Sequence, residues 1–404
     1  MEILVLANWF PYPPDSGTKI RALNLLRHLA SCHKVTLIAL SDDVERDEAQ
    51  KQDLISCCQE IHIVPRIVFN PYRLRAILAA LSPIPRYLID TFSEEMQRTV
   101  QHVLEATHFD IVIALEGMAL YASKVRGPVR VLDDLQVSTW RDAYSKEFDL
   151  VRRVRYAPTF WKFKRMTRWF VRHCDAYMTT SERERQHVRV VVSFASTKHS
   201  AVVPNGLDLS FYNGDFGVPR PGTLIFSGSL TFHLNLWAIQ FFLRDIYPLI
   251  QQRYPQAVLR ITGRTDGVPL DKLPDAEGVI LTGYLDDIRP AIAQSWVSVV
   301  PLTMGGGTRL KILEAMALGT PVVSTSKGAQ GLEVTNGMDI LIADEPTEFA
   351  DAVLRLLDDS ALRTKLVANG QRLVGERYDW DQIGRKLNRF LHQVIQKHRH
   401  QEAK

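Results

Sequence analysis

Short apolar runs alternate with stretches of helical periodicity along most of this 404-residue chain. This alternation is typical of parallel sheets built from β–α–β units. In the first half, seven apolar runs are expected to be strands, at residues 3–7, 35–40, 61–64, 111–115, 129–132, 176–179 and 201–203. Helices are expected between them, for example at residues 18–30 and 94–106.

A second series of elements begins after Pro204-Asn205-Gly206, where the first series breaks. Its expected strands are residues 224–227, 257–262, 279–281, 297–300 and 321–324, with 339–342 as a further candidate, and a helix is expected at 235–253. The pattern predicts an α/β protein with two doubly wound, Rossmann-like domains, at 1–203 and 204–378. Such domains bind ligands at the carboxyl ends of their strands, here in a central crevice that the two domains face.

Composition narrows the class of protein. Apolar residues make up 46% and charged residues 23%, as in soluble globular proteins. No run of about 20 apolar residues is present, the start reads as a strand, and the four cysteines lack metal spacing, so a cytoplasmic protein is expected. The formal net charge of +4 is concentrated in residues 1–200, and a basic half without a nucleic-acid motif favours anionic ligands or an anionic surface over nucleic acid, although an ordinary solvated surface is an equal alternative.

The stretch "GGGTRLKILEAMALGTPVVST" follows an expected strand and opens a helix. Arg309 and Lys311 fall in the first turn of that helix, where the helix dipole disfavours positive charge. Glycines let backbone N–H groups approach a ligand, so the two cations become favourable once a multiply charged anion such as a diphosphate is bound. In the alternative reading, Lys311 and Glu314 are a surface pair. The expected core face is Leu310, Leu313, Met316 and Ala317.

A similar arrangement occurs near the N-terminus, in "NWFPYPPDSGTKIRALNLLRHL". Gly17 precedes a helix that carries Lys19 and Arg21 in its first turn, which predicts that both loops share one anion. The alternative is that these two charges are simply solvated. The expected core face of this helix is Ile20, Leu23, Leu26 and Ala30.

With these loops, "VPNGLDLSFY", "FSGSL" and "KILEAMALGTPVV", the chain resembles the family 4 glycosyltransferases (glycosyl transferase group 1) of the GT-B fold, over nearly its whole length. The resemblance implies retaining transfer of a sugar from a UDP- or GDP-linked donor, with no cofactor and no required metal. Glycan, lipid-linked or small-molecule acceptors are implied, in glycan, exopolysaccharide or glycolipid synthesis. It also implies a C-terminal helix at residues 379–398 that crosses back to the first domain.

The resemblance carries over to individual positions. The implied donor-binding residues are Gly17, Thr18, Gly228, Gly263, Arg264, Tyr284, Leu285, Gly305, Gly306, Gly307, Thr308, Arg309, Lys311 and Glu314. Within this set, Glu314 would accept hydrogen bonds from ribose hydroxyls, Arg309 and Lys311 would hold the diphosphate, and Gly263, Arg264, Tyr284 and Leu285 would flank the nucleobase.

Three positions depart from the family pattern. Gly306 stands where many members have a glutamate, and "GSLTFHLNLW" lacks the usual Arg and Lys, which Arg309 and Lys311 would replace. No histidine follows the expected strands at 111–115 and 129–132. Glu116, Asp133 and Asp134 stand there instead, as candidates to orient the acceptor hydroxyl or as solvated loop carboxylates. No metal site is expected at Asp133-Asp134, because no histidine or third carboxylate is near in sequence.

Three rival functions share parts of this pattern. A nucleotide-sugar 2-epimerase of the same architecture would need catalytic carboxylates and a histidine that the sequence does not place. An NAD-dependent dehydrogenase would show G-x-G-x-x-G after a strand, which neither domain has. A non-catalytic sugar-nucleotide-binding scaffold is motivated by Gly306.

Residues 152–172 form an amphipathic stretch. One arc contains Tyr156, Phe160, Phe163, Met166 and Phe170, and another contains Lys162, Arg165, Arg168 and Arg172. This pattern predicts peripheral contact with an anionic membrane on its inner face, and packing against the core with a solvated basic face is the alternative.

Overall fold

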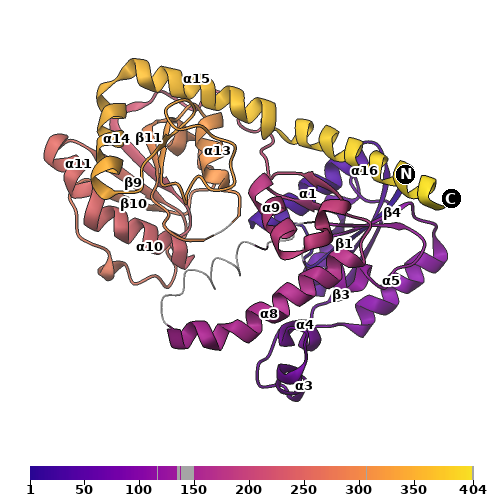
Figure 1. Ribbon diagram of the computed structural model, residues 1–404. Coiled ribbons are helices and arrows are strands. Elements are labelled where there is room, and N and C mark those ends of the chain that lie inside the picture. The colour runs from indigo at the N-terminus through magenta and orange to yellow at the C-terminus, as the bar shows by residue number, and fades with distance from the viewer. Residues whose placement is uncertain (116, 134–136, 138–149, 306, 403–404) are drawn as a thin grey trace. The chain divides into compact units, whose positions relative to one another are not determined.

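The computed structural model describes residues 1–115, 117–133, 137, 150–305 and 307–402, which form two compact α/β units (Figure 1). Unit 1 contains Met1–Pro204 together with Gly384–Lys404, and unit 2 contains Asn205–Ile383. Each unit is built on its own sheet, in which every strand pairing among the described residues is parallel. The predicted α/β class is therefore confirmed.

The seven-stranded sheet of unit 1 has the order β3-β2-β1-β4-β5-β6-β7. Its strands are β1 (Glu2–Ala7), β2 (Lys34–Ser41), β3 (Glu60–Pro65), β4 (Ile111–Ala114), β5 (Val129–Leu132), β6 (Ala176–Thr179) and β7 (His199–Val202). Its central strands are buried along almost their entire length, which explains why they read as continuous apolar runs.

Helices accompany this sheet. They are α1 (Gly17–Ala30), α2 (Val44–Ala49), α3 (Leu74–Leu78), α4 (Arg86–Asp90), α5 (Glu94–Ala106), α6 (Ala119–Ala122), α8 (Leu150–Arg172), α9 (Glu182–Val191) and the greater part of α16 (Trp380–Glu402), with 3₁₀ turns at Lys51–Leu54, Ala79–Leu81 and Ser193–Thr197. Local chemistry sets their ends and faces. In α5, the Ser93 hydroxyl accepts a hydrogen bond from the Met96 N–H, and Met96, Val100 and Val103 form the buried stripe.

The six-stranded sheet of unit 2 has the order β10-β9-β8-β11-β12-β13. Its strands are β8 (Arg220–Ser227), β9 (Val258–Thr262), β10 (Val279–Gly283), β11 (Ser295–Val300), β12 (Val322–Ser324) and β13 (Leu341–Ile342). Its helices are α10 (His233–Phe241), α11 (Tyr247–Arg253), α12 (Arg289–Ala293), α13 (Leu310–Ala317), α14 (Pro346–Asp358) and α15 (Ser360–Arg377), with a 3₁₀ turn at Leu270–Lys272.

The single helix expected at 235–253 is divided in the structure. A π-helical turn at Phe242–Ile246 separates α10 from α11. Pro248 at the start of α11 is the physical reason, because proline lacks an N–H and its ring displaces the carbonyl four residues earlier.

The end of the chain forms one helix, α16, whose residues from Gly384 onward belong to unit 1. His33 and Asn388 are hydrogen-bonded, with 3.1 Å between Nε2 and Oδ1. A Cβ built on Gly384 would lie 2.7 Å from the His28 ring, so α16 packs closely against α1 at this glycine. Leu387 and Leu391 are buried on its apolar face.

Both sheets reverse their strand order at the first strand of the unit. The reversal lies between β1 and β4 in unit 1 and between β8 and β11 in unit 2. Ligands of open α/β sheets bind beside the carboxyl ends of strands at such switch points. The loops after β8 and β11 are therefore the first place to look for a site in unit 2.

Candidate functional site

Two glycines follow the neighbouring strands β8 and β9 of unit 2. Gly228 has a φ of 147° and Gly263 a φ of 124°, a backbone conformation that favours glycine. A Cβ built on Gly263 would lie 2.6 Å from the carbonyl carbon of Gly228. The two loops thus touch backbone to backbone, and this contact requires glycine at position 263.

Lys311, near the start of α13, lies against the loop that follows β8. Its Nζ donates a hydrogen bond to Asn235 Oδ1 at 3.1 Å and lies 4.3 Å from the centroid of the Phe226 ring. A Cβ on Gly228 would approach Nζ to 2.6 Å. Burial, and after it the charge of Arg309, lowers the pKa of Lys311 to about 7. A bound anion would stabilise the protonated form of this amine.

Arg309 immediately precedes α13, and its guanidinium lies beside Met304 and Gly305. Nη2 lies 3.4 Å from the carbonyl oxygen of Met304, and a Cβ on Gly305 would approach Nη2 to 2.8 Å. Nε is buried and makes no hydrogen bond within the described part of the chain. Burial lowers the pKa of Arg309, but a guanidinium keeps its proton at neutral pH. A buried N–H donor without a partner raises the free energy of the folded protein. An anion that accepts a hydrogen bond from Arg309 would therefore be stabilising here.

The first turn of α13 contains no acidic residue that would balance the two cations. The buried positions of α13 are Ile312, Leu313, Ala315 and Met316, so the predicted core face was partly wrong. Leu310 and Ala317 are only partly buried, because α13 packs against α15 as well as against the sheet and turns Ile312 and Ala315 inward. The N-terminus of α13 therefore carries two cations and an unopposed helix dipole.

Glu314 lies one turn further along α13 and is held from a distant loop. Its Oε1 accepts a hydrogen bond from the Tyr212 hydroxyl at 3.0 Å. Burial raises the pKa of Glu314, and burial together with the Glu314 charge raises the pKa of Tyr212. The tyrosine loop is fixed in turn by Arg289, whose guanidinium lies 3.7 Å from the centroid of the Phe211 ring and pairs with Asp287.

The loops after β9 and β10 bring a cation and an aromatic ring together. The Arg264 guanidinium lies 5.3 Å from the centroid of the Tyr284 ring, and Tyr284 is 62% exposed. The Arg264 carbonyl accepts hydrogen bonds from Leu230 N and Ser229 Oγ, which ties the loop after β9 to the loop after β8. Leu285 packs on the unit 2 core. An exposed ring beside a guanidinium is a suitable surface for a nucleobase to stack on.

In unit 1, Gly17 and Thr18 begin α1 after the proline-rich loop. A Cβ on Gly17 would meet nothing within 4 Å, so open space adjoins the backbone there. Thr18 and Lys19 line a cavity of about 470 Å³ at the ends of β1 and β2, and Lys19 pairs with Asp15 at 3.2 Å.

Arg21 differs from the sequence expectation. It was expected to face an anion or solvent, but it is 4% exposed and donates two hydrogen bonds to Asp133, at 2.8 and 2.6 Å. Asp133 is buried as well, so it is not a solvated loop carboxylate. The predicted core positions Ile20 and Ala30 of α1 are only partly buried, whereas Arg21 takes a buried position.

Three predicted residues, Glu116, Asp134 and Gly306, lie outside the described residues. Next to the first of them, a Cβ on Gly117 would lie 3.2 Å from the Asn8 amide, so the ends of β1 and β4 meet at the switch point of unit 1. Thr308 stands between the glycine loop and Arg309 and is partly buried. The described residues contain no cluster of three or more His, Cys, Asp or Glu suited to a metal ion.

Sequence reasoning missed three residues of the unit 2 site: Asn235, Tyr212 and Phe226. Tyr212 and Phe226 occur inside motifs that carry the family resemblance, and Asn235 stands in the segment that lacks the usual Arg and Lys. Their partners are far away in sequence, 102 residues for Tyr212 and Glu314, so neither spacing nor periodicity indicates them.

Known proteins match the chain in both halves. The family described as "Glycosyltransferase Family 4" matches residues 16–211, and the family described as "Glycosyl transferases group 1" matches residues 221–359. A Klebsiella pneumoniae protein described as "uncharacterized 44.6 kDa protein in cps region" is 23% identical over 94% of this chain and 96% of its own. The phosphatidyl-myo-inositol mannosyltransferase of Mycobacterium tuberculosis is 29% identical over 209 residues, which cover 48% of this chain and about half of that enzyme.

Solved structures share the fold. Anabaena HepE in complex with UDP superposes with a TM-score of 0.67 at 17% identity, over 97% of this chain and all of that one. Sucrose-phosphate synthase of Thermosynechococcus elongatus superposes with a TM-score of 0.66 at 17% identity, over 98% of this chain and 100% of that one. The two parallel-sheet units and these structures define a GT-B architecture. The chain belongs to the family 4, group 1 glycosyltransferases and is a glycosyltransferase.

Proposed function

We propose that this chain is a retaining glycosyltransferase that moves a sugar from a UDP- or GDP-linked donor to an acceptor hydroxyl without a required metal. The observation that carries the proposal is the pair Arg309 and Lys311, partly buried beside the N-terminus of α13 at the switch point of unit 2. Two cations beside a helix N-terminus are the arrangement expected of a site that binds a diphosphate. HepE, which has the same architecture, was crystallised with UDP and glucose.

In this proposal, the diphosphate lies between Arg309, Lys311 and the backbone N–H groups of Gly305–Thr308. Glu314 accepts hydrogen bonds from the ribose hydroxyls, and the carboxylate is kept in place by Tyr212. The nucleobase lies beside Arg264 and Tyr284, over the glycine contact of Gly228 and Gly263.

Transfer needs no protein nucleophile in this proposal. The acceptor oxygen forms its bond to the anomeric carbon on the face from which the phosphate leaves, and the departing phosphate oxygen takes the acceptor proton. The negative charge that develops on the phosphate is stabilised by Arg309 and Lys311, each worth about 2–4 kcal/mol by analogy with single oxyanion donors. In this scheme the cations replace a metal as the stabilising charge.

Carboxylates of unit 1 are the candidates to orient the acceptor hydroxyl: Glu116, Asp133 and Asp134. Asp133 is held on both oxygens by Arg21. Each carboxylate oxygen has a second lone pair, but the Asp133 side chain is 1% exposed, so an acceptor hydroxyl would reach it only if neighbouring side chains move. Two relatives, a protein of a cps region and a phosphatidyl-myo-inositol mannosyltransferase, support a glycan or lipid-linked acceptor.

Donor identity is tested first, by thermal shift of the full chain with a panel of UDP- and GDP-sugars, since a ligand of the native state raises its stability. The donor that stabilises the chain is then incubated with candidate acceptors, with and without EDTA. The proposal expects nucleoside diphosphate release in EDTA and a product whose anomeric configuration, read by NMR, equals that of the donor.

Other outcomes would indicate a different function or mechanism. Binding without nucleotide release would indicate the sugar-nucleotide scaffold, and a sugar epimerised on its nucleotide would indicate the 2-epimerase. Inverted product, or activity lost in EDTA and restored by a divalent cation, would contradict the retaining or the metal-independent part of the proposal.

A further inference from the structure

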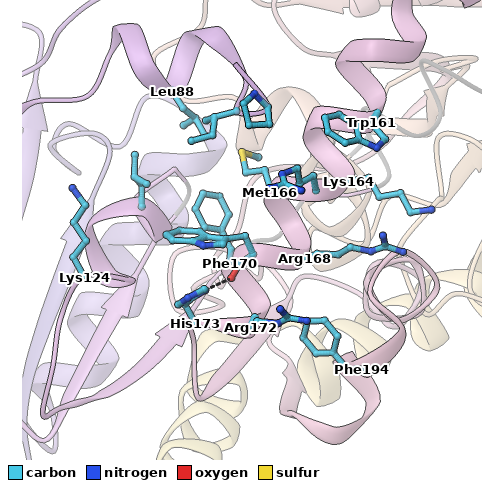
Figure 2. Close-up of a pocket in the computed structure, with 15 residues that line it drawn as sticks. Leu88, Lys124, Trp161, Lys164, Met166, Arg168, Phe170, Arg172, His173 and Phe194 are labelled. Atoms are coloured by element: carbon cyan, nitrogen blue, oxygen red, sulfur yellow. Dashed lines mark hydrogen bonds between the residues drawn. The ribbon is translucent and has the colours of Figure 1, made fainter. Parts of the chain in front are cut away.

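Unit 1 has a cavity of about 1000 Å³ on the side of α8, well away in sequence from the residues placed in the donor site. The C-terminal part of α8, from Trp161 to Arg172, forms one wall (Figure 2). The remaining wall consists of Pro83, Ile84, Leu88, Leu120, Lys124 and Phe194. All of these residues belong to unit 1. The volume lies at the upper end of the range for small-molecule sites.

The floor of this groove is apolar. Met166 and Phe170 lie at its middle in Figure 2, and Phe170 is 6% exposed. Trp161 and Trp169 stand at the wall and remain 53% and 39% exposed. These two tryptophans lie outside the apolar arc that the sequence predicted for this helix. Large exposed aromatic side chains around a concave surface indicate a binding site for an apolar group.

Apolar surface continues beyond the groove onto the neighbouring short helices. Ile77, Leu78, Leu81 and Ile84 are all more than 40% exposed. Leu81, in the 3₁₀ turn after α3, is 93% exposed, and Lys162 of α8 donates a hydrogen bond to the adjacent Ala80 carbonyl. Exposed apolar side chains therefore adjoin the groove on the side of Ile84, which is itself part of the lining.

Positive charge surrounds this floor. The basic residues of the lining are Lys124, Lys164, Arg165, Arg168, Arg172 and His173, and the lining contains no acidic residue. In Figure 2, Lys124 and Arg168 stand on opposite sides of the apolar floor. Within the described part of the chain, none of the five Lys and Arg residues forms an ion pair with a carboxylate.

Three of these cations lie against aromatic rings instead, and Arg168 Nε donates a hydrogen bond to the Val191 carbonyl at 3.0 Å. The Arg165 guanidinium lies 5.7 Å from the centroid of the Trp161 ring, and the Arg172 guanidinium lies 5.3 Å from that of Phe194. Lys124 Nζ lies 4.2 Å from the centroid of the Phe92 ring. A cation on an aromatic face keeps its hydrogen-bond donors available for an anion, so the rim is complementary to a negatively charged head group.

We propose that this groove binds a phosphate-bearing amphiphile, with its hydrocarbon chain on the Met166–Phe170 floor and its phosphate among the cations of α8. A free inorganic anion would leave the apolar floor unfilled, and an uncharged chain would leave the cations unpaired. The further identification of this amphiphile as the lipid-linked acceptor of the enzyme rests on the proposed function, whereas its binding does not.

The test uses the full chain and monomeric dodecyl phosphate below its critical micelle concentration, with binding followed by calorimetry and by tryptophan fluorescence. Dodecyl maltoside supplies the same chain with a neutral head, and inorganic phosphate supplies the head alone. Dodecyl phosphate is expected to bind about tenfold or more tightly than dodecyl maltoside, because several cations meet its head group. Inorganic phosphate is expected to show no saturable binding.

Two groove variants and two matched controls locate the site. Trp161→Ala and Arg165→Glu, both at exposed positions, are each expected to weaken dodecyl phosphate binding about tenfold. Trp237→Ala and Arg244→Glu change equally exposed residues of unit 2 and should leave it unchanged. The groove variants should keep the thermal stabilisation that nucleotide gives to the wild type. Loss of this stabilisation would indicate a defect in the donor site and would not bear on the groove.

Equal affinity for the two detergents, or equal affinity of the groove variants and the controls, would overturn the proposal. So would binding only to anionic phosphatidylglycerol vesicles, because that outcome would indicate a membrane surface in place of a groove for one molecule.

Discussion

The charge on Lys311 is the residue-scale feature that is most open to measurement. Its amine is partly buried next to Arg309, and its pKa falls to about 7 from an unfolded value near 10.4. Between these two pH values the unfolded chain binds more protons than the folded chain, so this residue makes stability rise with pH over that window. Below about pH 7 the charged amine destabilises the unliganded protein in full.

Lys311→Met is therefore expected to melt at a higher temperature than the wild type at about pH 6, with an advantage that shrinks toward about pH 9. Lys34→Met, at an exposed lysine of unit 1, is the control and should show no such pH dependence. Scanning calorimetry at several pH values measures both. If the melting temperatures of Lys311→Met and the wild type differ by the same amount from pH 6 to 9, the pKa of Lys311 is not lowered in the folded protein and the prediction is wrong.

A second residue-scale prediction concerns Glu314, whose proposed ribose contact is the same in the ground state and in the transition state. Glu314→Gln should raise the donor KM and the Kd for UDP or GDP about tenfold while changing kcat little. Tyr212→Phe removes the hydroxyl that holds this carboxylate and should act in the same direction but less strongly. Steady-state kinetics and calorimetry decide. A fall in kcat at unchanged KM would place Glu314 in the chemical step.

The loops after β8 and β9 make the clearest prediction at the scale of elements. A Cβ on Gly263 would meet the backbone of Gly228 at 2.6 Å, in a conformation that side chains rarely adopt. Gly263→Ala should thus cost about 2–4 kcal/mol of stability and abolish nucleotide binding. Gly267→Ala, at a φ of 71° with open space around it, is the matched control and should cost about 1 kcal/mol. Similar melts for both variants would show that the loop contact is dispensable.

Elements were predictable from sequence where burial sets the pattern. Parallel strands buried on both faces read as apolar runs, so the strands of both sheets were located correctly. The segment 235–253 was predicted as one helix, and the structure has a π-helical turn in it just before Pro248. Side-chain partners were not predictable, since Arg21 meets Asp133 across 112 residues and only the folded sheet brings them together. The glycine and cation loop could be found because its residues are consecutive, whereas Asn235 and Tyr212 come from other loops.

At the scale of the molecule, the last helix belongs to the unit that is made by the start of the chain. Leu387, Leu391 and Val394 of α16 are each at most 3% exposed. Truncation after Ile383 removes all three, and loss of each buried side chain costs about 2–5 kcal/mol, more than a marginally stable unit can lose. Amide hydrogen exchange should then rise throughout β1–β4 while β8–β11 stay protected.

Truncation after Gln396 is the control, because it removes only the end of α16 and leaves these apolar residues in place. It should keep the exchange pattern of the full chain. Unchanged protection of β1–β4 in the longer truncation would show that α16 is not part of the unit 1 core.

The donor diphosphate that Arg309 and Lys311 are proposed to hold is the centre of the proposed function, and Arg309→Ala tests it most directly. The measurement is kcat/KM with the matched donor, alongside the melting temperature of the same variant. In Arg309→Ala, kcat/KM should fall about 10²-fold or more, because one cation that stabilises the leaving phosphate is lost. The melting temperature should equal or exceed that of the wild type, since Arg309 is a partly buried cation at a helix N-terminus. A large drop in melting temperature with unchanged kcat/KM would show that this cation supports the fold, and would contradict the donor site.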